Sequence, residues 1–189
     1  MTTDTNTAAL QNLQTLRSQL QGAFIGRDAE VDGLLLATLS RTHLLLLGPP
    51  GTAKSLITQV FAKALGGDYF QRLLTAFTTP EEVFGPYDLT ALDGGRYERA
   101  IQSYLPTATT SFLDEVFKAN SAVLNSLLTM LNEREFDNGT NRISCPLQVC
   151  VGASNEYPQD SSLEALYDRF MLRYWTDYVP TRQDRMALL

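Results

Sequence analysis

The sequence predicts an α/β domain in which helices cover both faces of a central five-stranded parallel sheet. Short apolar runs that suit buried strands alternate with segments whose apolar residues recur at helical spacing. The first run, residues 44–47, is leucine throughout, as is typical of a strand buried on both faces of a parallel sheet. It leads directly into a glycine-rich loop and then into a helical pattern. This order of elements is the signature of a three-layer α/β domain.

The remaining elements follow from the same two periodicities. Strands are predicted over residues 44–47, 69–74, 109–113, 147–153 and 174–179. Helices are predicted over residues 10–20, 31–39, 56–65, 80–84, 123–131 and 163–171. Two β-hairpin inserts are predicted, one over residues 87–105 with its turn at Asp93-Gly94-Gly95, and one around Asp137-Asn138-Gly139.

The chain divides into three parts. Residues 1–23 form a polar tail, Met1–Thr7, and a helix. Residues 24–180 form the α/β core, and 189 residues in all are sufficient for one such domain. Residues 181–189 begin a further helical pattern, which we interpret as the start of a linker to a C-terminal domain that lies beyond the chain.

Composition excludes several classes of protein. The net charge of −6, from 15 basic and 21 acidic residues, argues against a general nucleic-acid surface. No apolar run approaches the roughly 20 residues of a membrane span, and the N-terminus lacks the pattern of a signal peptide. Cys145 and Cys150 are the only cysteines and His43 is the only histidine, which disfavours a zinc site and a disulfide framework. We expect reduced thiols, a cytoplasmic location and a structural role for His43.

The most informative segment is the loop after the first strand, Gly48-Pro49-Pro50-Gly51-Thr52-Ala53-Lys54-Ser55. Backbone N–H groups of such a loop cradle phosphate oxygens, the lysine reaches the β- and γ-phosphates, and the serine hydroxyl ligates Mg²⁺. A turn without any phosphate role is the alternative, which the register of Lys54 and Ser55 after a buried strand disfavours. Ala53 replaces the glycine of the general motif, and we expect it to adopt helical backbone angles that tolerate its Cβ.

Polar side chains follow two further strands. Asp114 and Glu115 end the third predicted strand, and Asn155 follows the fourth. Ligands of open parallel sheets bind at this edge, so Asp114 is predicted to hold Mg²⁺, Glu115 to activate water, and Asn155 to position water or the γ-phosphate. The alternatives are an acidic helix N-terminus and an ordinary turn asparagine.

Two arginines complete the candidate site. Arg169 lies in the last predicted helix and Arg173 follows about one turn later, so we expect both on one helical face. An arginine beside a neighbouring subunit's γ-phosphate stabilises transition-state charge. A surface salt bridge is the alternative for both, and the residues alone do not separate the two interpretations.

Seven stretches together resemble the MoxR branch of the AAA+ ATPases, and within it the regulatory ATPase variant A (RavA) group. They are LLLLGPPGTAKS, FTTPEEVFGPYDL, GRYERAIQSYLPTA, FLDEVFKAN, LLTMLNERE, ASNE and SSLEALYDRFMLRYW. The family also carries alanine before the lysine of its phosphate loop, so Ala53 belongs to the resemblance.

The resemblance implies a Walker A loop at residues 48–55, a Walker B pair at Asp114-Glu115 and sensor 1 at Asn155. It implies an arginine finger at Arg169, with Arg173 as the second choice, and an adenine pocket lined by the segment Phe24-Ile25-Gly26. The hairpins over 87–105 and around Asn138-Gly139 match the helix 2 insert and the hairpin before sensor 1, which face the pore of a ring.

The family forms hexameric rings, remodels or chaperones protein clients, and works with von Willebrand factor A-domain partners. Its members carry a helical lid with a sensor 2 residue after the α/β core, and this chain stops before it. The predicted function is therefore Mg²⁺-dependent ATP hydrolysis coupled to the remodelling of a protein client. The alternatives are a nucleotide-gated assembly switch with negligible turnover and a small-molecule P-loop kinase, for which no acceptor-site pattern appears.

Overall fold

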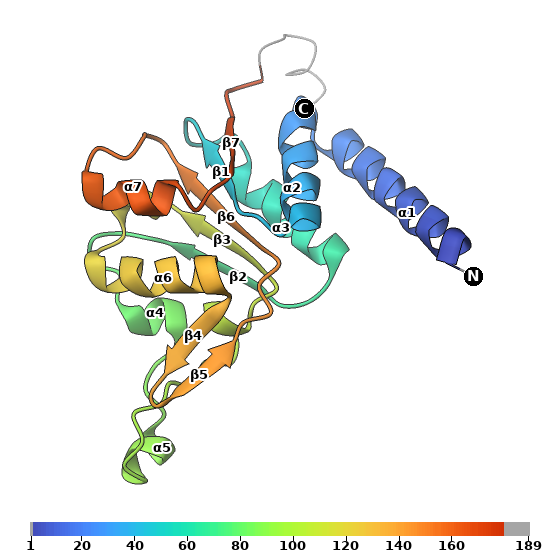
Figure 1. Cartoon of the computed structure of the whole chain (residues 1–189). Coiled ribbons are helices and arrows are strands. Elements are labelled where there is room, and N and C mark those ends of the chain that lie inside the picture. The colour runs from blue at the N-terminus through green and yellow to red at the C-terminus, as the bar shows by residue number, and fades with distance from the viewer. Residues whose placement is uncertain (1, 180–189) are drawn as a thin grey trace.

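The computed structural model describes residues 2–179, without the side chains of residues 2–6 and 161–162. Its centre is a five-stranded sheet in the order β2-β3-β6-β1-β7, with every neighbouring pair parallel (Figure 1). The strands are β1 (Leu44–Leu47), β2 (Tyr69–Leu73), β3 (Thr110–Asp114), β6 (Val149–Ser154) and β7 (Leu172–Trp175). The predicted α/β class and five-stranded parallel sheet are confirmed.

The last strand lies earlier in the chain than the sequence predicted. β7 pairs with β1 from Leu44↔Leu172 to Leu47↔Trp175, so the short partner strand fixes where the ladder ends. Beyond it, Thr176 donates one more backbone hydrogen bond to Leu47, at 2.6 Å, and residues 177–179 add no further pairing to the ladder. The aromatic residues over 174–179 therefore predicted a strand, but only residues 174 and 175 belong to β7.

Helices cover both faces of the sheet. The helices are α1 (Thr2–Ala23), α2 (Asp28–Ser40), α3 (Lys54–Leu65), α4 (Pro80–Phe84), α5 (Leu89–Asp93), α6 (Ser121–Glu133) and α7 (Ser161–Tyr167), with 3-10 turns at Leu105–Thr107 and Val116–Lys118. The predicted tail over residues 2–7 is wrong, because α1 begins at Thr2 and runs outward from the body of the domain (Figure 1). The predicted linker over residues 181–189 lies outside the described residues.

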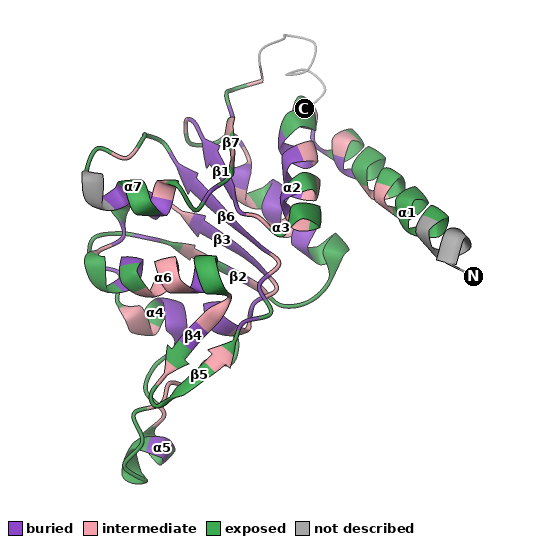
Figure 2. Ribbon diagram, viewed as in Figure 1, coloured by how far each residue is buried: buried purple, intermediate pink, exposed green. Residues whose placement is uncertain are grey.

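β1 shows how the three layers meet. Successive side chains of a strand point to opposite faces, so Leu44 and Leu46 pack with α2 and α3, whereas Leu45 and Leu47 pack with α6 and α7. All four leucines are buried, and the buried residues in Figure 2 concentrate in the sheet and on the helix faces that cover it. Two separate apolar cores thus fix the position of β1. Because the next loop begins at the end of this strand, its first residue is fixed as well.

The two inserts project together from one end of the domain (Figure 1). The predicted hairpin around Asn138-Gly139 is confirmed as β4 (Glu135–Asn138) and β5 (Asn141–Ser144), an antiparallel pair. The predicted hairpin over residues 87–105 is wrong. It contains one isolated antiparallel bridge, Tyr87↔Arg99, and the short helix α5, because the Asp88 side chain accepts hydrogen bonds from Thr90 and Ala91 and starts a helical turn.

Side-chain hydrogen bonds join the two inserts, one of them from Asn141 Nδ2 to Glu98 Oε1 at 3.3 Å. Asn138 accepts a hydrogen bond from the backbone N–H of Arg99 at 2.6 Å and donates one to its carbonyl at 3.2 Å. The Asn138 amide thus satisfies both backbone groups of Arg99, as a neighbouring β-strand would do with its own N–H and C=O groups. The inserts are therefore connected to each other as well as to the core.

Within residues 2–179 no helix has the length and apolar character needed to cross a membrane.

Candidate nucleotide-binding site

The phosphate loop lies between β1 and α3, where the sequence places it. Gly48 has a φ of 140°, and a Cβ at this position would overlap the carbonyl oxygen of Thr176. Gly51 has a φ of 76°. Both positions require glycine for backbone reasons, which accounts for their place in the motif.

Ala53 does not adopt the helical angles predicted for it. Its φ of 66° and ψ of 20° lie in the left-handed region, and it precedes α3 as the N-cap residue without a side-chain cap bond. An L-residue with a Cβ is strained there, by roughly 1–2 kcal/mol. The loop needs a left-handed residue at this point to turn its N–H groups inward, which is why glycine is the general choice.

Replacing Ala53 with glycine is expected to raise the free energy of unfolding by about 1 kcal/mol, because it relieves this strain. Ala62→Gly, the same substitution inside α3, is the matched control and is expected to lower it by about 1 kcal/mol or more. Chemical denaturation of both variants measures the difference. A loss of stability in Ala53→Gly would show that the left-handed angles are not those of the protein in solution.

Lys54 is buried and held within the loop. Its Nζ donates to the carbonyl oxygens of Gly48 at 2.8 Å and Pro49 at 2.7 Å, and to Thr52 Oγ1 at 3.2 Å. Burial lowers the pKa of Lys54, and the nearby carboxylates of Asp114 and Glu115 act in the opposite direction. Carbonyl oxygens thus occupy donors of the ammonium group, and phosphate oxygens would offer the same acceptors with more negative charge.

The strand ends bring the predicted residues together as expected. A cavity of about 330 Å³ is lined by Lys54, Ser55, Asp114, Glu115 and Asn155, together with residues of the loop. Asp114 is the last residue of β3, Asn155 follows β6, and β1 lies next to β6 in the sheet. The carboxyl ends of parallel strands meet at one edge, so three distant segments converge on one site.

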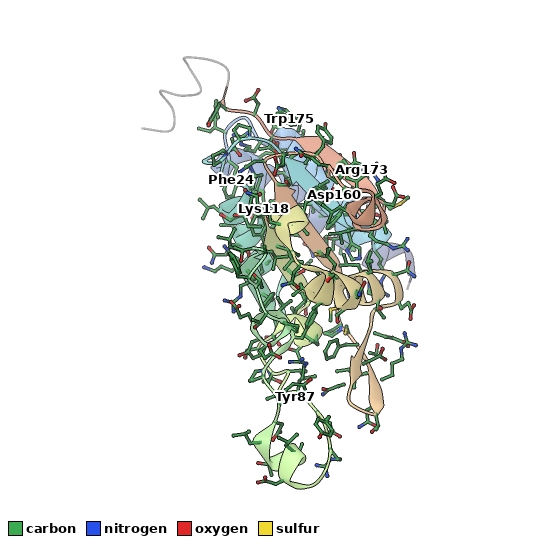
Figure 3. All side chains as sticks on the ribbon, turned by 90° about the vertical axis from the view of Figure 1, so that its left-hand side faces the viewer. Phe24, Tyr87, Lys118, Asp160, Arg173 and Trp175 are labelled. Carbon is green, nitrogen blue, oxygen red and sulfur yellow. The ribbon has the colours of Figure 1, made fainter. Side chains whose placement is uncertain are left out.

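Glu115 is held away from helical geometry. Its φ of 51° is left-handed, and Asn155 Nδ2 donates to its Oε1 at 2.6 Å. Lys118 forms an ion pair with its Oε2 at 3.2 Å. The sequence analysis missed Lys118, whose signal was its spacing of three residues from Glu115. Figure 3 shows Lys118 and Phe24 in the upper part of the domain, well away from Tyr87 beside the inserts.

An apolar cavity of about 580 Å³ adjoins the phosphate loop. Its lining includes Phe24, Ile25, Tyr178 and Val179, and it shares residues 51–53 and Leu56 with the cavity described above. Ile25, predicted from the family resemblance, lines it. Gly26 does not, but with a φ of 70° it turns the chain here. Phe24, which the resemblance also places beside the adenine, lines it as well. Tyr178 and Val179 were not predicted, because only the tertiary fold brings them to this cavity.

The two candidate arginines lie apart from this cavity, and the expectation that they share a helical face is wrong. Arg169 follows α7, whereas Arg173 lies in β7, because the helix ends at Tyr167. Arg173 is engaged locally: its guanidinium stacks on the Tyr167 ring at 3.8 Å, and its Nε donates to Phe170 O at 2.9 Å. Arg169 is exposed and lines a different cavity.

The chemistry of the site fits a magnesium nucleotide. A cradle that a Cβ would fill at Gly48 and a buried lysine with carbonyl acceptors suit phosphate oxygens. Ser55 and Asp114 are oxygen donors of the kind that Mg²⁺ prefers, and they line the same cavity. The adjoining apolar cavity suits a flat, weakly polar base.

Fold and site together define an AAA+ P-loop ATPase domain. A family model described as the MoxR domain in the MoxR–vWA–β-propeller ternary systems matches residues 11–189, and the chain belongs to the MoxR family.

The chain is also similar in sequence to several relatives and in fold to a solved structure. An uncharacterised protein of Methanocaldococcus jannaschii is 44% identical over 165 residues, which cover 87% of this chain and 43% of that protein. The chaperone MoxR1 of Mycobacterium tuberculosis is 27% identical over 184 residues, covering 94% of this chain and 48% of the relative. The crystal structure of a candidate ATPase from Cytophaga hutchinsonii has a TM-score of 0.71 at 20% identity, covering 96% of this chain and 57% of that one. The chain spans under half the length of both sequence relatives.

Proposed function

We propose that the chain is the catalytic core of a protein that hydrolyses ATP and uses the energy to remodel a protein client. The observation that carries this proposal is the convergence of Lys54, Asp114, Glu115 and Asn155 on one cavity beside the phosphate loop. Membership of the MoxR family and likeness to a protein named as a chaperone support it.

Each residue has a distinct role in this proposal. The N–H groups of the loop and the Lys54 ammonium bind the phosphates, and Glu115 accepts a proton from the attacking water. Asn155 orients that water or the γ-phosphate. Ser55 and Asp114 would hold Mg²⁺, which supplies charge neutralisation between the phosphates when bound. Ile25 and its apolar neighbours would contact the adenine.

A second candidate is a nucleotide-gated assembly switch with negligible turnover. The contacts of Glu115 favour it, since both carboxylate oxygens are engaged, by Asn155 and by Lys118. A general base must release such partners before it can reach water. In the hydrolase these contacts describe a resting arrangement, whereas in the switch they would persist with ATP bound.

The assembly belongs to the same proposal. We assign Arg169 as the finger that reaches a neighbouring copy in a hexameric ring, because Arg173 is already engaged by Tyr167 and Phe170. A von Willebrand factor A-domain protein is the proposed partner, in line with the systems after which the matching family model is named. The likeness to the RavA group and the cytoplasmic location stay predictions.

Steady-state phosphate release by the intact protein tests the proposal. We expect Mg²⁺-dependent turnover that Lys54→Ala abolishes by removing the phosphate-binding charge, whereas Lys63→Ala, an exposed lysine in the same helix, leaves it unchanged. Tight ATP binding without turnover would favour the switch.

The trans role of Arg169 has its own measurement. Arg169→Ala and Lys54→Ala proteins are each expected to be inactive, by a factor of about 10³ or more for the finger. Mixed rings should recover activity, because an intact loop then meets an intact finger. Absence of recovery would contradict action across subunits.

A further inference from the structure

A third cavity lies at the opposite edge of the sheet and is rich in arginine. It has a volume of about 380 Å³, and Arg41, Arg134 and Arg169 line it with His43 and Asp168. Arg41 ends α2 just before β1, Arg134 ends α6, and Arg169 follows α7. Three separate segments therefore each contribute an arginine to the lining of one cavity.

These charges are poorly compensated. Within residues 2–179, Arg41 and Arg169 form no ion pair with a carboxylate, and Asp168, the acidic residue in the lining, pairs with Arg173 at 3.6 Å instead. Arg134 directs its donors to carbonyl oxygens, Leu131 O at 2.7 Å and Arg41 O at 2.6 Å. The bond to Arg41 O restrains the backbone of Arg41, and this restraint fixes the point from which its side chain extends.

Backbone strain marks the same two residues. Arg41 has a φ of 54° and Arg134 a φ of 58°, both left-handed positions at helix ends where glycine is the unstrained choice. Arginine at such a position is disfavoured unless its side chain is needed. A cation at a helix C-terminus gains some dipole stabilisation, which is the competing explanation for Arg41.

The cavity cannot serve the nucleotide of its own chain. Arg41 precedes β1 and the phosphate loop follows it, and a four-residue strand spans about 13 Å. An anion at this edge must therefore come from another molecule. The net charge of −6 disfavours a general polyanion surface, so a compact, strongly charged group is the better match.

We propose that Arg41 acts with Arg169 as a second cation toward the nucleotide phosphates of a neighbouring copy of this chain. The inference rests on the proposed ring ATPase and extends it to a residue outside the predicted site. Arg169 and Arg41 line the same cavity and come from different segments, so the two guanidinium groups would contact different oxygens of one triphosphate.

Arg41→Gly in the intact protein is the decisive variant, because glycine suits the left-handed backbone and the fold does not suffer. We expect a Tm equal to or above that of the wild type, and a kcat lower by about tenfold or more, the effect of losing one transition-state contact. Binding of ATP by the variant's own loop is expected to stay within about twofold of wild type, since the site in cis is untouched. Ser103→Gly is the matched control, because Ser103 is also left-handed at a φ of 69° and carries no charge.

Mixing supplies the second measurement. Arg41→Gly subunits have intact loops and Lys54→Ala subunits have intact Arg41, so mixed rings should recover turnover. A lower Tm with unchanged kcat would assign Arg41 to the helix dipole and overturn the inference. If wild-type rings hydrolyse ATP and Arg169→Ala abolishes turnover while Arg41→Gly does not lower it, the inference fails and the proposed function stands. If wild-type rings do not hydrolyse ATP, the proposed function itself fails.

Discussion

Replacing Glu115 with glutamine is expected to lower kcat for ATP hydrolysis at least about 100-fold, because the amide cannot accept the proton of the attacking water. Binding of ATP should change little, since Glu115 lines the cavity while Lys54 and the loop N–H groups are the groups proposed to hold the phosphates. The amide can still accept the hydrogen bond that Asn155 donates to Oε1, so the local fold is retained. Phosphate release and equilibrium ATP binding by the intact protein measure the two parameters separately.

Glu135→Gln is the matched control for this experiment. Glu135 lies in β4, pairs with Arg142 at 2.6 Å and is remote from the phosphate loop, so turnover should be unaffected. Turnover of Glu115→Gln within about threefold of wild type would contradict the role of Glu115 as general base, since such catalysis contributes roughly 10²-fold or more.

Acidification from pH 7 to pH 5 is expected to lower the free energy of unfolding by about 2 kcal/mol through His43 alone. His43 is 3% exposed, and burial lowers its pKa from 6.5 to about 4, with the nearby Arg134 charge acting in the same direction. A histidine whose folded pKa is depressed stabilises the fold above its unfolded pKa of about 6.5, and that stability is lost as the pH falls toward the folded value.

The hydrogen bonds of His43 explain why its neutral form is required. The backbone N–H of Cys150 donates to Nδ1 at 3.0 Å, so Nδ1 carries no proton. Nε2 then holds the proton and donates to Leu131 O at 2.8 Å. A second proton at Nδ1 would break the bond to β6 and place a buried charge beside Arg134.

Denaturation curves at several pH values test this account. His43 is the only histidine, so no other side chain has an ordinary pKa near 6.5. His43→Gln keeps a donor and an acceptor but cannot titrate. Its unfolding free energy is expected to be lower at pH 7 and to vary little between pH 7 and pH 5. A slope equal to that of the wild type would show that other groups cause the acid sensitivity.

The sequence was sufficient to predict that the candidate site residues lie around one cavity, because two rules act there. The phosphate loop is a contiguous motif, and its register after a buried strand locates Lys54 and Ser55 without tertiary information. Asp114 and Asn155 lie over 40 residues apart in the chain, yet both end parallel strands, and parallel strands end at one edge. The strand periodicity therefore predicted that Asp114 and Asn155 lie close to the phosphate loop, although these residues are distant in the chain.

Prediction failed where backbone angles or tertiary contacts decide the outcome. The left-handed angle of Ala53 follows from the closure of the loop, and no residue preference of alanine indicates it. At residues 87–105 the turn signal Asp93-Gly94-Gly95 suited a hairpin, but the cap of Asp88 produced a helical turn. The arginine-rich cavity unites Arg41, Arg134 and Arg169 from three segments, and no spacing in the chain relates them.

The side chain of Asn138 has a mechanical consequence. It bonds both backbone groups of Arg99, and Arg99 in turn bonds Glu81 at 3.1 Å and the carbonyl of Gly85 at 2.8 Å. The path from the β4–β5 hairpin to α4 is thus continuous in hydrogen bonds, although the two inserts belong to distant parts of the chain. We expect the two inserts to move as one rigid unit that is connected to the domain at two places. A displacement that starts at α6 would therefore move both inserts together.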